Sequence, residues 1–289
     1  MITPAEVAAA GQLACLLEVS APKPGNVSPE RHFHDTRYED FLASAVAIGP
    51  ALAQAHAQPL GATIRRAVED TLRWTRSNTN LGIVLLLAPI ARAAGRGRGS
   101  LRERLQQVLA ETTVADAAEV YTAIRHARPG GLGQAPEEDV ARAPSVDLRA
   151  AMGLAAGRDA IAREYVTDFA LTFEQGVPAL RRCLDEGLAW TDASVETYLT
   201  LLEAAPDTHI ARKLGAQEAA QISRRAGEVR SAGGTRTPEG RKALERLDRE
   251  LRDERNRRNP GSTADLTCAA IFAVILEGGW HRQVNRRAE

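Results

Sequence analysis

Apolar and polar residues alternate along this chain with the period of an α-helix. Leu13, Leu16 and Leu17, for example, have the spacing of a buried stripe on one helical face. Runs of β-branched residues with a period of two, which are typical of strands, are essentially absent. The pattern therefore predicts an all-α protein. We expect residues 1–289 to form a single compact multi-helix domain of about a dozen helices.

Breaks in this pattern, often at glycine or proline, set the expected ends of the helices. The predicted helices cover residues 4–20, 37–57, 61–75, 80–94, 101–110, 114–127, 147–157, 159–175, 178–187, 192–204, 208–227, 238–255 and 262–278. The segment Arg241–Arg258 alternates acidic and basic residues. This pattern is typical of a solvated helix face, so we expect no binding surface there.

Polar clusters lie where the predicted helices begin or end. They cover residues 21–27, 32–36, 78–82, 206–209 and 259–265. Five such clusters are more than a helical protein needs to connect its helices. Backbone N–H groups at helix N-termini bind phosphate, and carboxylates bind divalent metal ions. We therefore expect the clusters to converge on one nucleotide site.

The first cluster follows the first helix and contains Pro22, Lys23, Pro24, Gly25 and Asn26. The two prolines stiffen the backbone, and Gly25 and Asn26 tolerate positive φ and can aim N–H groups inward. Lys23 would act as a compact charge for phosphate. The alternative is a loop that ends the helix and carries a surface lysine.

The second cluster contains His32, His34 and Asp35. A transition-metal site is one reading, but a loop histidine is more often a hydrogen-bond partner. Asp35 is better placed to hold Mg²⁺ or a ribose hydroxyl.

The third cluster, with Asn78, Thr79, Asn80 and Gly82, precedes the most apolar helix. Asn and Thr are common helix caps, so capping is the simplest interpretation. Gly82 is a poor helix former, and its benefit would be the close approach of a ligand to the backbone. Phosphate or sugar binding is the functional alternative.

The last two clusters open two further helices. Asp207 precedes a helix that carries Lys213 about one turn later, and its simplest role is an N-cap. Gly261 and Ser262 begin the final long helix, and Asp265 lies one turn into it, where its side chain would point back toward the loop. Walker A, Rossmann, Gly-x-Ser-x-Gly and His-Glu-x-x-His motifs are all absent from the sequence.

Composition narrows the possible partners and location. The formal net charge is +0 and the pI is about 7.0, which argues against nucleic acid as the main partner. Cys15, Cys183 and Cys268 are too few and too scattered for a disulfide framework, so a reducing cytoplasm is expected. No signal peptide is apparent, and the most apolar stretch, Leu81–Ala94, is too short to span a membrane.

The clusters, taken in order, resemble the triphosphoribosyl-dephospho-CoA synthase family. The resemblance rests on residues 22–27, Asp35, residues 78–80 with Gly82, Asp207-Thr208 and residues 260–266. It implies an all-helical transferase that moves the 5-triphosphoribosyl group of ATP to a hydroxyl of 3'-dephospho-CoA and releases adenine. ATP would be a substrate and Mg²⁺ a cofactor, while a homodimer is left open.

The resemblance also implies roles for the quoted residues. Asp35, Asp207 and Asp265 would serve as base, ribose or metal groups, with Asp35 and Asp265 on the metal. The nucleotide would be held by Lys23, Gly25, Asn26, Asn78, Thr79, Asn80, Gly82, Lys213, Gly261 and Ser262.

Two motifs depart from the usual family pattern. In one of them, well-known members carry Asp-Thr-Asn where this chain has Asp207-Thr208-His209. In the other, they carry Asn-Thr-His-Lys-Gly where this chain has Asn78-Thr79-Asn80-Leu81-Gly82, so one phosphate-region cation is missing. The chain looks more like a divergent branch found in archaea and methylotrophic bacteria. Two alternatives therefore stay open: a related transferase with another acceptor, as in C1-cofactor biosynthesis, or a non-catalytic nucleotide-binding helical protein.

Overall fold

The computed structural model describes residues 2–130 and 133–280. Over these residues the chain forms helices and no β-strand, with a single isolated bridge between Ser28 and Arg31. The predicted all-α fold is confirmed. The chain divides into two compact units: Met1–Leu16 with Glu39–Ala170, and Leu17–Tyr38 with Leu171–Glu289. We call them the first and the second unit, and the expected single domain stays a prediction.

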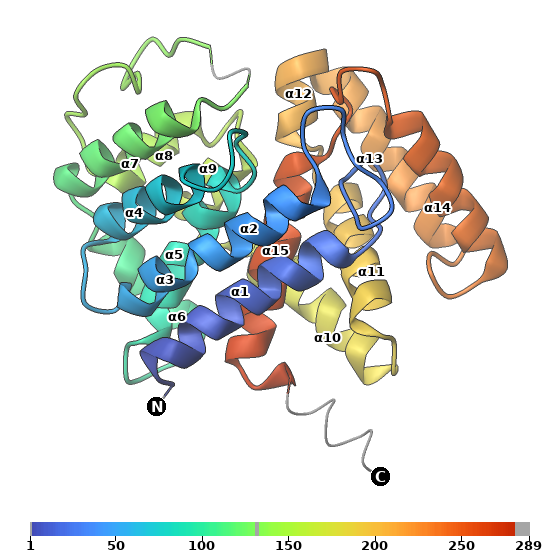
Figure 1. Cartoon of the computed structure of the whole chain (residues 1–289), viewed down its shortest axis with the longest axis horizontal. Coiled ribbons are helices and arrows are strands. Elements are labelled where there is room, and N and C mark those ends of the chain that lie inside the picture. Colours follow the sequence, from blue (N-terminus) through green and yellow to red (C-terminus); the bar gives the residue numbers. More distant parts are fainter. Residues whose placement is uncertain (1, 131–132, 281–289) are drawn as a thin grey trace. The chain divides into compact units, whose positions relative to one another are not determined.

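The first unit is organised around an apolar helix, α5. Its helices are α1 (Pro4–Ser20, which ends in the second unit), α2 (Tyr38–Ala47), α3 (Gly49–Gln54), α4 (Leu60–Leu72), α5 (Leu81–Ala94), α6 (Leu101–Ala110), α7 (Val114–Ala127), α8 (Leu148–Ala155) and α9 (Ala160–Val166). Helix α5 packs against α3, α4, α6 and α9 (Figure 1), and all its residues except Gly82 and Arg92 are buried. A helix that is apolar on every side needs such neighbours.

Helices α4 and α7 approach closely because the contact residue is a glycine. A Cβ on Gly61 would lie 2.5 Å from the backbone oxygen of Asp116. The Gly61 N–H donates to Asp116 Oδ1 at 2.8 Å, and the other carboxylate oxygen completes a capping box with Thr113 at the start of α7. Asp116 thus caps the start of α7 and also holds the start of α4 against it.

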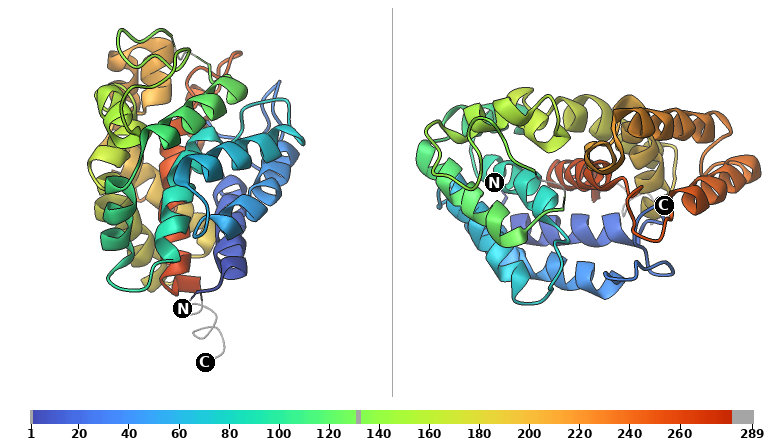
Figure 2. Two further views of the ribbon diagram at one scale, coloured as in Figure 1. Left: turned by 90° about the vertical axis from the view of Figure 1, so that its left-hand side faces the viewer. Right: turned by 90° about the horizontal axis from the view of Figure 1, so that it is seen from above.

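The second unit is organised around α11 and α15. Its helices are the π-helix η1 (Leu171–Gly176), α10 (Val177–Asp185), α11 (Trp190–Ala204), α12 (Thr208–Leu214), α13 (Ala216–Ser231), α14 (Pro238–Leu251) and α15 (Gly261–Leu276). Helix α11 packs against α10, α13 and α15, and α13 also packs against α14, which lies beside it in Figure 2 (orange). Tyr198, Leu199 and Leu247 belong to the shared core.

Three of the predicted helices are broken in the structure. The segment 37–57 divides before α3, because Pro50 has no N–H to donate to Val46, whose oxygen accepts from Gln12 instead. The segment 208–227 divides at Gly215, where φ is 94°. The segment 159–175 divides after α9, where Asp168 and Phe169 have φ values of 53° and 58°.

None of the helices in the described part of the chain has the length and apolarity needed to cross a bilayer.

Candidate functional site

Asp207 joins the N-termini of α12 and α15 in the second unit. Its Oδ1 accepts from the backbone N–H of Ile210 at 3.0 Å, which caps α12. Its Oδ2 accepts from the N–H and the hydroxyl of Thr263, both at 2.8 Å. Beside it the hydroxyls of Thr208 and Ser262 are 3.0 Å apart. Two of the predicted clusters therefore meet here.

Burial raises the pKa of Asp207, although the bonds from Thr263 and from the first turn of α12 oppose the shift. Only 2% of the residue is exposed. Its carboxylate oxygens are thus occupied by internal donors, and the group is well placed to hold the two helix ends together. The predicted catalytic role of Asp207 stays a prediction.

The loop that contains Gly25 and Asn26 is held by Tyr198 of α11. The Tyr198 hydroxyl donates to the oxygen of Pro24 at 2.7 Å and accepts from Asn26 Nδ2 at 3.2 Å. Burial raises the pKa of Tyr198, so the hydroxyl keeps its proton and remains a donor. Asn26 is 6% exposed, and its side chain shapes the loop from within.

Gly25 lets this loop lie against the start of the last helix. Its φ is +76°, and a Cβ there would lie 2.8 Å from Leu251 Cβ and 3.1 Å from Pro260 Cδ. Side chains at such a position would be strained in φ and crowded by both neighbours. The first and last predicted clusters therefore lie side by side in the second unit.

Lys23 is buried and paired, which differs from the expected open phosphate ligand. Its Nζ is 2.9 Å from Glu18 Oε1 and donates to the backbone oxygens of Glu18 and Ala21. Only 1% of Lys23 is exposed. The lysine therefore closes the end of α1 onto the loop, and its assignment to phosphate stays a prediction.

Lys213 lies within electrostatic reach of two predicted aspartates. Burial and the charge of Arg212 lower the pKa of Lys213, while Asp253, Asp207 and Asp35 act in the opposite direction. Its Nζ donates to the oxygen of Asn256 at 3.5 Å. Lys213 is half-buried, and its charge acts on both predicted acids, Asp207 and Asp35.

His209 and Gly261 belong to the clusters at residues 206–209 and 259–265. A Cβ on Gly261 would lie 3.4 Å from His209 Cγ. Burial, together with the charges of Lys213 and Arg212, lowers the pKa of His209 to about 3. The imidazole is therefore neutral at pH 7, and it covers the first residue of α15 without adding charge.

Asp35 and Asp265 are the residues predicted to bind metal. The Asp35 side chain is 61% exposed, with His34 Nε2 at 3.8 Å, and Asp265 is half-buried in the first turns of α15. Among residues 2–130 and 133–280, no three His, Cys, Asp or Glu side chains gather as a metal cage. Mg²⁺ that arrives on a nucleotide needs only one or two carboxylates, so the absence of a cage does not decide the matter, and metal binding by Asp35 and Asp265 stays a prediction.

The histidines of the second cluster make ordinary hydrogen bonds. His32 Nδ1 accepts from the N–H of Tyr38 at 3.1 Å, and His34 Nδ1 is 3.2 Å from Asn256 Nδ2. These partners favour the structural interpretation of both rings.

The cluster at residues 78–82 lies in the first unit and begins α5. Asn78 Oδ1 accepts from the N–H of Leu81 at 3.1 Å and so satisfies the first N–H of the helix, while the N-cap residue, Asn80, makes no capping bond with its side chain. The Thr79 hydroxyl lies 2.5 Å from that of Ser44, and Asn80 Nδ2 donates to Thr71 at 3.0 Å. Their side chains thus bond within the unit, while Gly82 lies half-buried in the first turn.

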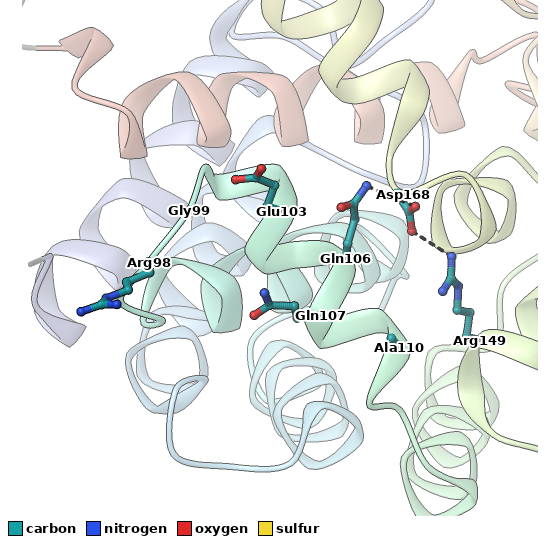
Figure 3. Close-up of a pocket in the computed structure, with 8 residues that line it drawn as sticks. All are labelled: Arg98, Gly99, Glu103, Gln106, Gln107, Ala110, Arg149 and Asp168. Carbon is teal, nitrogen blue, oxygen red and sulfur yellow. Dashed lines mark hydrogen bonds and ion pairs between the residues drawn. The ribbon is translucent and has the colours of Figure 1, made fainter.

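A surface hollow of about 740 Å³ in the first unit contains none of the predicted residues (Figure 3). It is lined by Arg98, Gly99, Glu103, Gln106, Gln107, Ala110, Arg149 and Asp168. Arg149 pairs with Asp168 at 2.9 Å, and Glu103 completes the capping box of Ser100. These charges have internal partners: the Arg149–Asp168 pair joins α8 to the turn after α9, and Glu103 serves the start of its own helix, α6.

Sequence reasoning missed Glu18, Tyr198 and Asp248, which hold the loop 22–26. The Gly25 N–H donates to Asp248 Oδ1 at 2.8 Å across 223 residues of sequence. Glu18 and Tyr198 occupy ordinary helical positions, and Asp248 lies in the segment expected to be a solvated face. The spacing of the sequence carries no signal for these contacts.

A family model described as ATP:dephospho-CoA triphosphoribosyl transferase matches residues 4–284. A "Probable 2-(5''-triphosphoribosyl)-3'-dephosphocoenzyme-A synthase" of Pseudomonas paraeruginosa is 30% identical over 115 residues, 39% of each chain. A protein of the same name from Pseudomonas savastanoi pv. phaseolicola is 28% identical over 155 residues, 50% of this chain and 53% of that one. The chain thus matches about half or less of the length of these relatives.

A solved structure from Archaeoglobus fulgidus, assigned as a triphosphoribosyl-dephospho-CoA synthase, is similar in fold. Its TM-score is 0.62 and its identity 30%, over 82% of this chain and 99% of that chain.

Proposed function

Because the chain belongs to the ATP:dephospho-CoA triphosphoribosyl transferase family, we propose that it transfers the 5-triphosphoribosyl group of ATP to a hydroxyl of 3'-dephospho-CoA. Adenine is the leaving group. The observation that carries the proposal is the bonding of Asp207 and Thr208 to Thr263 and Ser262. Two motifs that carry the family resemblance, Asp207-Thr208 and residues 260–266, are thus hydrogen-bonded to each other.

The reaction breaks the bond between ribose C1' and N9 of adenine, and its electron pair leaves with the base. A new bond forms between C1' and the acceptor oxygen. The acceptor hydroxyl loses a proton and the departing adenine gains one. Positive charge develops on the sugar between these events, and carboxylates stabilise such a charge.

Asp265 and Asp35 are the acids we assign to this chemistry. Asp265 lies in the first turns of α15, beside the Gly261–Thr263 turn, and Asp35 is exposed to solvent. One of them takes the proton of the acceptor hydroxyl. Mg²⁺, held by the same two carboxylates, would neutralise charge on the triphosphate. Asp207 acts as a positioning residue, since its oxygens are engaged by α12 and α15.

The phosphates are assigned to the groups around the N-terminus of α15. Gly261 and Ser262 supply the first turn of a helix of 16 residues, whose dipole favours an anion there. Lys213 adds a positive charge from the last turn of α12. Gly25 and Asn26 form the neighbouring wall, which Lys23 supports through its bonds to Glu18 and Ala21. The assignment of Asn78, Thr79, Asn80 and Gly82 to the nucleotide stays a prediction from the sequence.

The test is the release of free adenine from ATP and Mg²⁺, with and without 3'-dephospho-CoA, measured by chromatography. We expect release that depends on dephospho-CoA. Asp265→Asn should lower the rate at least about 100-fold with the fold intact, because it removes a charge and hardly any volume. The control is Asp192→Asn, the same change at a residue that pairs with Arg241 on the surface.

Adenine release without dephospho-CoA would replace the proposal with a different acceptor or with hydrolysis. ATP binding without any adenine release would indicate a non-catalytic protein. A normal rate in Asp265→Asn would remove Asp265 from the site.

A further inference from the structure

Helix α14 carries one carboxylate that is hidden from solvent. The side chain of Asp248 is 8% exposed, although its sequence neighbours Arg249 and Glu250 are exposed. A buried carboxylate is costly unless donors and counter-charges surround it. The partners of Asp248 therefore show what the burial achieves.

Those partners belong to the Pro22–Asn26 loop and to its supports. Asp248 Oδ1 accepts from the Gly25 N–H at 2.8 Å, and Oδ2 accepts from Arg252 Nε at 2.8 Å. Arg31 also pairs with Oδ2. Arg252 in turn donates from Nη2 to the oxygen of Asn26 at 2.7 Å. Asp248 and Arg252 thus bond to two consecutive residues of the loop.

The charge of Asp248 is stable at neutral pH. Burial alone would raise its pKa, but the bonds from Arg252 and Gly25 and the charges of Arg252 and Arg31 outweigh burial and lower the pKa. The carboxylate is therefore ionised at neutral pH.

The arrangement is also open on one side. Arg31, Asp248 and Arg252 line a cavity of about 470 Å³, together with Glu30, His32, Glu245 and Arg249. Asp248 and Arg252 bond to the same loop that Tyr198 holds through hydrogen bonds to Pro24 and Asn26.

We propose that Asp248 is a positioning residue for nucleotide binding, acting through the Gly25–Asn26 turn. It holds the Gly25 N–H and, through Arg252, the Asn26 carbonyl, and so fixes the left-handed conformation at Gly25. This inference rests on the proposed function, which assigns the loop to ATP. The ligand positioned by the loop is the nucleoside triphosphate of the proposed reaction.

The test compares Asp248→Asn with Glu196→Gln. Glu196 is a matched control because it is 5% exposed, accepts from the Thr235 N–H at 2.5 Å and pairs with Arg236 at 2.6 Å. It therefore clamps a turn in the same way, but at residues 233–236, which bind no proposed substrate. Both changes remove one buried charge and keep the side-chain volume.

We expect Asp248→Asn to lower kcat/KM for ATP about 10- to 100-fold, since small displacements of binding groups have effects of this size. Peptides covering residues 22–27 should exchange amide hydrogen faster by mass spectrometry. Both variants should lower the urea midpoint by a similar amount. Glu196→Gln, however, should keep the wild-type kcat/KM for ATP and the wild-type exchange of residues 22–27.

Equal kinetic losses in the two variants, or unchanged exchange at residues 22–27 in Asp248→Asn, would overturn the inference. If the wild-type protein releases no adenine, the proposed function fails separately, and exchange together with ATP affinity by calorimetry still decides the role of Asp248. Faster exchange and a weaker ATP affinity would then support it, and unchanged values would overturn it.

Discussion

Lys23 and Glu18 form an ion pair in the second unit that is almost completely shielded from solvent. Their side chains are 1% and 5% exposed, and the ion pair spans 2.9 Å. Moving either charge out of water costs several kcal/mol, which is offset only while the partner is present. The pair therefore makes the junction of α1 with the Pro22–Asn26 loop sensitive to the loss of one residue.

Lys23→Ala is expected to lower the free energy of unfolding by about 3–5 kcal/mol, because Glu18 would remain buried without its counter-charge. Urea unfolding at pH 7 measures the change. The double variant Lys23→Met with Glu18→Gln removes both charges and should lose less than the single variant. A double variant that is as unstable as Lys23→Ala would contradict this account.

Helix ends in this protein are set by individual residues with special backbone demands. Pro50 separates α2 from α3, and Gly215 separates α12 from α13 with φ at +94°. A Cβ added at Gly215 would meet open space, as would one at Gly157, but Gly157 lies outside the left-handed region. The two glycines therefore differ in backbone conformation and not in crowding.

Gly215→Ala is expected to destabilise the protein by about 1 kcal/mol, because an L side chain is strained at positive φ. Gly157→Ala should be neutral or stabilising by up to about 1 kcal/mol, since it reduces only the entropy of the unfolded chain. Thermal unfolding of both variants checks the difference. Equal effects would mean that strain at Gly215 does not set the boundary between α12 and α13.

At the scale of the whole molecule, stability depends on groups that bind protons differently in the folded and unfolded chain. His209 has a pKa lowered to about 3 by burial and by the charges of Lys213 and Arg212. The unfolded chain, with a pKa of about 6.5, therefore binds this proton more tightly. The contribution of His209 is full above pH 6.5 and is lost as the pH falls toward 3.

The wild-type free energy of unfolding should thus fall by about 2 kcal/mol between pH 7 and pH 5 through His209, at about 1.36 kcal/mol for each unit below 6.5. His209→Gln should remove that part of the slope, and exposed His56→Gln should keep it. Urea unfolding at both pH values measures the slopes. An unchanged slope in His209→Gln would show that the ring stays accessible to protons in the folded protein.

Local patterns predicted the helical class, and they placed polar clusters at helix ends. Periodicity depends on neighbours three and four residues away, so most helices were predicted to within a few residues. The boundary near Gly215 was wrong because an isolated glycine is tolerated inside many helices. The clusters at Asp207 and Gly261 were predicted from capping chemistry, and the structure joins them.

The sequence by itself determined the all-α class, the family and the polar clusters, because each of these depends on residue type and short spacing. The tertiary structure decided which charges leave the solvent. Lys23, Asp207 and Asp248 are buried by partners that the fold brings to them, and Gly25 meets Asp248 from 223 residues away. Burial and pairing are properties of the packed chain, and a carboxylate on a charged helix becomes a clamp only where a loop N–H lies within hydrogen-bond distance of it.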